Sequence, residues 1–66
     1  MERNLRLNWP SLVEEAVARR KSQGLTQELL AVLAGVSKPT LNAFEQGKTT
    51  ITLENALKIL RTVGLE

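Results

Sequence analysis

Four glycines, each placed directly after a short helical pattern, constrain the fold of this chain more than any other feature of its sequence. They are Gly24, Gly35, Gly47 and Gly64. Glycine is the usual residue at the left-handed position that ends a helix. Serine and threonine are among the preferred residues at helix N-caps, and they precede the same patterns at Ser11, Thr26, Ser37 and Thr52. The sequence therefore predicts an all-α domain of four short helices joined by short connections.

The first helix is predicted to begin at Ser11, because Ser11 and Glu14 have the spacing of a capping box. The other three helices are predicted to follow their hydroxyl caps and to end before the glycines. Apolar residues recur at helical spacing within these segments. The expected core residues are Leu25, Leu30, Leu33, Val36, Leu41, Phe44 and Leu57.

Residues 4–9 alternate between polar and apolar side chains, a pattern typical of an extended segment or strand. Leu5, Leu7 and Trp9 share the apolar side. A single strand needs a pairing partner, because its backbone groups are otherwise unpaired. The alternative is a tail whose Trp9 packs on the first helix. Both interpretations divide the chain into a short extended segment at 1–10 and a helical domain at 11–66.

Composition excludes several kinds of function for these 66 residues. The chain contains no His, Cys or Tyr, and all of its acidic residues are Glu. A zinc site or a histidine base is therefore impossible, and no metal or other cofactor is expected. No spacing suggests a nucleophile beside a base, and the glycines end helices rather than form a phosphate-binding loop. The sequence does not indicate an enzyme.

Charge and hydropathy give weaker information. The formal net charge of +2 is small for a nucleic-acid-binding protein. The longest apolar run, residues 29–34, is far shorter than the roughly 20 residues that cross a bilayer. The N-terminal residues lack the apolar region of a signal peptide. We expect a cytoplasmic protein with no membrane partner.

The connection at residues 34–37 carries the clearest functional signal, since it joins two helices through an alanine and a glycine. Such a turn lets helices cross steeply and projects the start of the second one, and an exposed α-helix fits the major groove of DNA. With GLTQ at 24–27, TL at 40–41 and EQGK at 45–48, the stretch resembles the Cro/lambda-repressor-type (XRE) helix-turn-helix family. The resemblance covers residues 11–64 and implies a compact four-helix DNA-binding domain.

A narrower resemblance is carried by residues 44–53, 57–60 and 64–66, which are similar to the HipB-type antitoxins of bacterial toxin–antitoxin operons. In that subfamily the helix-turn-helix protein dimerises, represses its own operon and binds a HipA-type kinase toxin. The resemblance therefore implies an autoregulating repressor that acts as a homodimer on palindromic double-stranded DNA. It also implies a HipA-type toxin as a second partner.

The resemblance assigns roles to individual residues. The base-contacting positions are Lys38, Pro39, Asn42 and Ala43. The phosphate-contacting positions are Gln27, Ser37, Lys48 and Thr49. An ion pair between Arg20 and Glu45 is implied to hold the first helix against the third. Lys38 can donate to guanine, and Asn42 can reach adenine or a phosphate, whereas proline and alanine offer only apolar contact. Many family members carry Arg or Gln where this chain has Pro39 and Ala43, so specificity is expected to depend more on DNA shape.

Two further features suggest contact with protein. Leu29 and Val32 match family positions that are commonly polar and face outward, so they predict an apolar partner surface. Leu5, Leu7 and Trp9 would extend this surface, or Trp9 or Leu7 would instead cover it. HipB-type proteins dimerise through a strand that follows the fourth helix. Here we expect that contact from residues 4–9, or from a helix face bearing Ile59, Thr62 and Val63.

Two functions from different classes therefore compete. The first is a sequence-specific DNA-binding repressor. The second is a protein-interaction module that keeps the helix-turn-helix fold without specific DNA binding, which the sparse base-contacting face and the small net charge favour. Substitution of Lys38 and Asn42 distinguishes the two functions. If the chain is a protein-interaction module, these substitutions leave its function unchanged.

Overall fold

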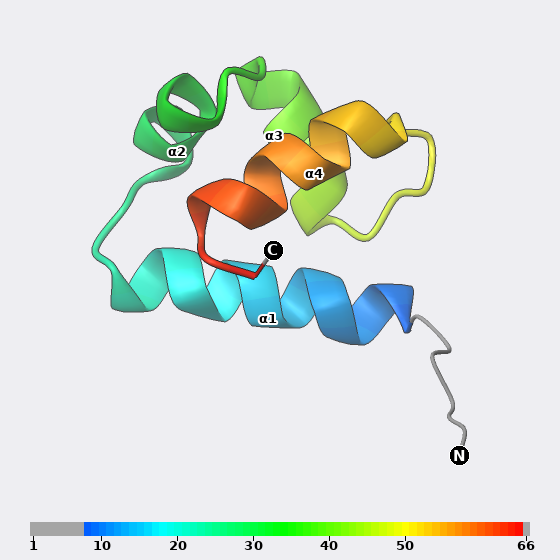
Figure 1. Ribbon diagram of the computed structural model, residues 1–66, viewed down its shortest axis with the longest axis horizontal. Coiled ribbons are helices and arrows are strands. Elements are labelled where there is room, and N and C mark those ends of the chain that lie inside the picture. The colour runs from blue at the N-terminus through cyan, green and yellow to red at the C-terminus, as the bar shows by residue number, and fades with distance from the viewer. Residues whose placement is uncertain (1–7, 66) are drawn as a thin grey trace.

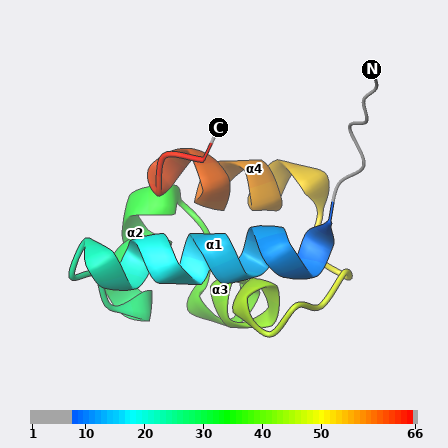
Figure 2. The ribbon, with the colours of Figure 1, turned by 90° about the horizontal axis from the view of Figure 1, so that it is seen from below.

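The computed structural model describes residues 8–65 of the chain and places four α-helices in them (Figure 1). These are α1 (Trp9–Ser22), α2 (Gln27–Ala34), α3 (Lys38–Glu45) and α4 (Leu53–Thr62). α1 runs along one side of the molecule, while α2, α3 and α4 gather on the other. α2 packs against both α3 and α4, and α1 packs against α3. In the perpendicular view α1 lies in front, with α3 and α4 on either side of it (Figure 2). The predicted all-α fold of four helices is confirmed.

Local capping explains where three of the helices begin and end. The hydroxyls of Thr26, Ser37 and Thr52 each accept a hydrogen bond from the backbone N–H three residues later. These bonds satisfy N–H groups that have no acceptor within the helix. Gly35 ends α2 with a φ of 78°, a conformation in which glycine avoids the Cβ penalty. The predicted boundaries of α2, α3 and α4 therefore agree with the structure.

The start of α1 differs from the prediction. Asn8 is the N-cap, and its Oδ1 accepts a hydrogen bond of 3.2 Å from the Ser11 N–H. Ser11 lies inside the first turn instead of capping it. Pro10 is compatible with this turn because the first residues of a helix need no N–H donor. Helix α1 thus begins at Trp9 rather than at Ser11, and Trp9, predicted to be extended, is helical. The other predicted extended apolar residues, Leu5 and Leu7, lie outside the described part of the chain.

The hydrophobic core draws side chains from all four helices. Leu30 of α2, Leu41 and Phe44 of α3 and Ile59 of α4 are almost completely buried. The partly buried ring of Trp9 meets Phe44 edge to face, with centroids 5.5 Å apart and planes at 88°, a favourable geometry for an aromatic pair. Trp9 therefore anchors the start of α1 to α3. Among the described helices, none has the length and hydropathy needed to cross a membrane.

Two predictions about apolar residues are wrong. Leu33 is 57% exposed and not a core residue, because α2 is apolar around most of its circumference and only the side with Leu30 and Ala31 faces the core. Ile59 and Val63 are buried, so the proposed dimer face on α4 does not exist in that form. Their spacing places them on the same side of α4, and that side packs into the domain.

Candidate nucleic-acid interface

α2, the turn at residues 35–37 and α3 form a helix-turn-helix unit whose second helix begins at the surface. Ser37 caps α3: its Oγ accepts a hydrogen bond from the Thr40 N–H at 3.2 Å and donates one to Thr40 Oγ1 at 2.8 Å. The hydroxyl of Ser37 is therefore engaged within the helix. The residue nevertheless lies exposed beside the first turn of α3, where the backbone N–H of Lys38 has no acceptor within the helix and can bind a phosphate.

The outward face of α3 carries the four residues predicted to contact bases. Lys38, Pro39 and Asn42 are exposed and Ala43 is partly buried, while Leu41 and Phe44 point into the core. A hollow of about 350 Å³ beside this face is lined by Gln27, Lys38, Pro39 and Asn42. A second hollow, of about 280 Å³, is lined by Pro39, Ala43 and neighbouring residues of the loop before α4. The face is thus a ridge between two shallow depressions. Gln27, which is predicted to contact a DNA phosphate, lies next to the residues predicted to contact bases.

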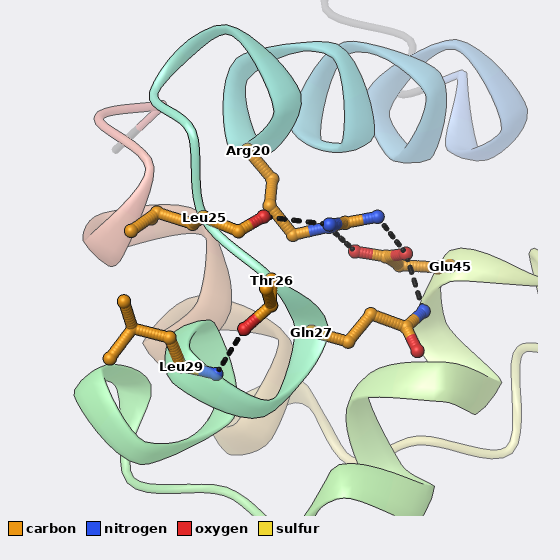
Figure 3. A network of polar contacts seen from close by, with 6 residues as sticks. All are labelled: Arg20, Leu25, Thr26, Gln27, Leu29 and Glu45. Atoms are coloured by element: carbon orange, nitrogen blue, oxygen red, sulfur yellow. Dashed lines mark hydrogen bonds and ion pairs between the residues drawn. The ribbon is translucent and has the colours of Figure 1, made fainter.

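Glu45, at the end of α3, holds three segments together (Figure 3). Its carboxylate accepts hydrogen bonds from Arg20 Nε at 2.7 Å and Arg20 Nη2 at 3.2 Å. Arg20 also donates to the carbonyl oxygen of Leu25 at 2.8 Å. The two charged side chains are only 12% and 8% exposed. The structure thus brings Arg20 and Glu45 together as a bidentate pair between α1 and α3.

Gln27 takes part in the same network, which the sequence did not predict. Its Nε2 donates to Glu45 Oε1 at 2.7 Å, and its side chain points toward Glu45 (Figure 3). The amide of glutamine has a second N–H, and the backbone N–H groups that open α2 have no acceptor within that helix. Gln27 can therefore donate to a phosphate while Glu45 fixes its position.

Lys38 is also paired, and with a residue that sequence reasoning did not identify as part of the site. Its Nζ lies 2.8 Å from Glu28 Oε2 in an exposed ion pair that bridges α2 and α3 across the turn. The hydrogen bond from Lys38 lowers the pKa of the Glu28 carboxyl below its ordinary value, with help from a backbone hydrogen bond and the lysine charge. Glu28 and Lys38 stand ten residues apart, so only the angle of the turn brings them together.

Lys48 and Thr49 lie in the exposed loop after α3, at the opposite end of that helix from Lys38. The backbone N–H of Lys48 donates to the carbonyl oxygen of Ala43 at 3.1 Å, which fixes the start of the loop. An eight-residue helix is about 12 Å long, a length similar to the width of the major groove. The structure therefore places the predicted phosphate residues at both ends of α3 and does not bring them together.

The predicted partner surface is divided by the structure. Leu29, Val32 and Leu33 on α2 are 45%, 75% and 57% exposed. Trp9 packs on Phe44 and lines a separate pocket with Ile51, Leu53 and Ala56. Trp9 therefore neither covers the α2 residues nor extends their surface. We call the patch formed by Leu29, Val32 and Leu33 the α2 apolar patch.

The turn, the caps and the exposed α3 face define a helix-turn-helix domain. Comparison with known proteins agrees: a family model described as helix-turn-helix matches residues 18–66. A protein of Haemophilus influenzae is 36% identical over 96% of this chain, which spans 61% of that relative. A protein of Methanothermobacter thermautotrophicus is 45% identical over 71% of this chain, which spans 68% of it. Both relatives bear the name uncharacterized HTH-type transcriptional regulator. The chain belongs to the XRE-type helix-turn-helix family.

Proposed function

We propose that the chain is the DNA-binding part of a transcriptional repressor, which inserts α3 into the major groove of double-stranded DNA. The exposed ridge of α3 carries this proposal, and it consists of Lys38, Pro39, Asn42 and Ala43. The ridge is polar at the end where Lys38 begins α3, and Gln27, the first residue of α2, lines the hollow beside it. Helix starts bind phosphate through their free N–H groups. The names of the two relatives support the same function.

In the proposed complex, two side chains read bases and two fit the groove. Lys38 donates to guanine O6 or N7, and Asn42 bonds to adenine. Pro39 and Ala43 make apolar contact with thymine methyl groups. Since direct contacts are few, groove shape and DNA deformability supply part of the specificity. Gln27 and Ser37 fix one DNA strand at the start of α3, and Lys48 and Thr49 fix the other near its end.

A homodimer on a palindromic operator completes the proposal. Two copies would place their α3 helices in successive major grooves, about 34–36 Å apart. We further propose that the operator lies upstream of the protein's own gene, so that the repressor regulates its own synthesis. The resemblance to HipB-type antitoxins supports this autoregulation.

The first experiment is a titration of DNA from upstream of the gene, with scrambled DNA of equal length as the control. Fluorescence anisotropy at two salt concentrations gives both affinities and their salt dependence. A preference of about 10³-fold or more for the upstream DNA, falling steeply with salt, supports a specific repressor. Equal weak binding to both duplexes, unchanged by Lys38→Ala and Asn42→Ala, contradicts it.

A second candidate function is binding to a protein, such as a HipA-type kinase toxin, with or without DNA. The α2 apolar patch favours it, because Val32 and Leu33 are more than half exposed on one short helix, where a contiguous apolar patch suggests an interaction site. The test is co-expression with any kinase-like protein encoded beside this gene. A complex that Val32→Lys abolishes, while Lys38→Ala leaves it intact, supports this function.

A further inference from the structure

We propose that Glu28 determines DNA specificity by positioning the ammonium group of Lys38, and this inference rests on the proposed DNA-binding function. The ion pair joins the first turn of α2 to the first residue of α3 at 2.8 Å. Both side chains are exposed, and Lys38 lines the hollow beside the ridge of α3 together with Gln27, Pro39 and Asn42. Glu28 is therefore an acidic residue at the edge of a surface proposed to meet a polyanion.

Lysine has enough hydrogen-bond donors for Lys38 to bond to Glu28 and to a base at the same time. An ammonium group has three N–H donors and no acceptor. One donor bonds to Glu28, and two remain for the O6 and N7 acceptors of guanine. Without Glu28, the flexible side chain of Lys38 could turn to any nearby phosphate, a contact that carries no sequence information. The carboxylate therefore directs Lys38 toward a base edge.

The charge of Glu28 acts in the same direction. A carboxylate close to DNA repels the phosphates of every sequence equally, so it weakens non-specific binding. In the specific complex this repulsion is offset, since Lys38 bonds to Glu28 and guanine at once. The expected result is a protein with modest affinity for random DNA and a larger ratio between specific and random sequences.

The experiment compares Glu28→Gln with the matched variant Glu15→Gln. Glu15 also forms an exposed ion pair, with Arg19 at 3.2 Å, but Arg19 donates to the Gly64 carbonyl and so lies beside the end of α4, away from α3. Both variants raise the net charge equally. The DNA probes are a duplex that the wild-type protein selects from a random library and a scrambled duplex of the same composition, titrated at two salt concentrations.

We expect Glu28→Gln to bind scrambled DNA more tightly than the wild type and to lose at least about fivefold in specificity ratio, the lower range for one base contact. Glu15→Gln should leave the ratio unchanged. In a Lys38→Met background, Glu28→Gln should no longer alter the ratio, because Glu28 has no lysine to position. An unchanged ratio in Glu28→Gln, or an equal loss in the Lys38→Met background, overturns the inference while the proposed function stands. Failure of the wild type to select any sequence overturns both.

Discussion

At the residue scale, Glu45 joins side chains from two other segments of the chain. It accepts hydrogen bonds from Arg20 and Gln27, and both members of its ion pair are largely buried. Removal of one partner from a buried pair leaves the other charge uncompensated. We therefore expect Glu45→Ala to lower the free energy of unfolding by about 3 kcal/mol, a large part of the total for a domain of this size. Urea denaturation followed by circular dichroism measures it.

The control for this substitution is Glu15→Ala, which breaks the exposed Glu15–Arg19 pair. Exposed pairs contribute at most about 1 kcal/mol. If Glu45→Ala is no more destabilising than Glu15→Ala, the network around Glu45 does not stabilise the fold. The loss of unfolding free energy in Glu45→Gln should lie between those of Glu45→Ala and Glu15→Ala. The glutamine retains an acceptor for one donor but loses the charge.

Glu28 gives a prediction about pH. The hydrogen bond from Lys38 lowers its pKa below the ordinary value of 4.5. A carboxyl group whose pKa is lower in the folded state stabilises the fold above its unfolded pKa and ceases to do so as the pH falls through its folded pKa. The ion pair should therefore persist at neutral pH and be lost only in acid below 4.5. Lys38→Met should raise the Glu28 pKa, as measured by carboxyl NMR titration, and an unchanged titration would show that the pair does not form.

At the element scale, the helix ends were predictable because their signals are local. Thr26, Ser37 and Thr52 lie within three residues of the N–H groups they bind, and left-handed glycine is an intrinsic preference. The exposure of Leu33 on α2 was not predictable from the same kind of signal. Leu29, Val32 and Leu33 are all apolar, and only packing against α3 and α4 decides which side of the helix is covered.

In the candidate site, too, the positions on one helix could be predicted, whereas the contacts between helices could not. The resemblance supplied the positions on α3, but it contained no sign that Glu28 contacts Lys38 or that Glu45 contacts Gln27. Both contacts join residues from different helices, so they depend on the crossing angles of the helices and not on sequence spacing. The start of α1 differs from the prediction for a different reason: Ser11 and Glu14 have the spacing of a capping box, but Asn8 caps the helix and Pro10 lies in its first turn.

The corrected start of α1 can be tested directly. Asn8→Ala should lower the free energy of unfolding by about 1 kcal/mol, since it removes the side-chain acceptor that caps α1. Ser11→Ala should have little effect, because Ser11 contributes only its backbone N–H to that bond. Thermal denaturation of the two variants decides between the cap positions, and a greater loss in Ser11→Ala would restore Ser11 as the cap.

The turn between α2 and α3 gives a second prediction for an element. Gly35 has a φ of 78°, and a Cβ added there would meet no atom within 4 Å. The cost of Gly35→Ala is therefore conformational, about 1–2 kcal/mol. Gly35→Asn should cost less, because asparagine enters the left-handed region more readily. Equal stability of the two variants by urea denaturation would mean that backbone strain does not govern this turn.

At the scale of the whole molecule, the proposed homodimer requires a surface that joins the two copies. Two predicted surfaces are already engaged within the domain, since Ile59 and Val63 are buried in the core and Trp9 packs on Phe44. The remaining candidate from the sequence is the alternating segment before Asn8.

We expect deletion of residues 1–7 to abolish the proposed dimer, as measured by light scattering. The thermal stability should persist, because Asn8 and Trp9 remain to cap and anchor α1. Val32→Lys is the matched control on the α2 apolar patch and should leave the dimer intact. If the deletion leaves the dimer intact and Val32→Lys disrupts it, the copies associate through α2.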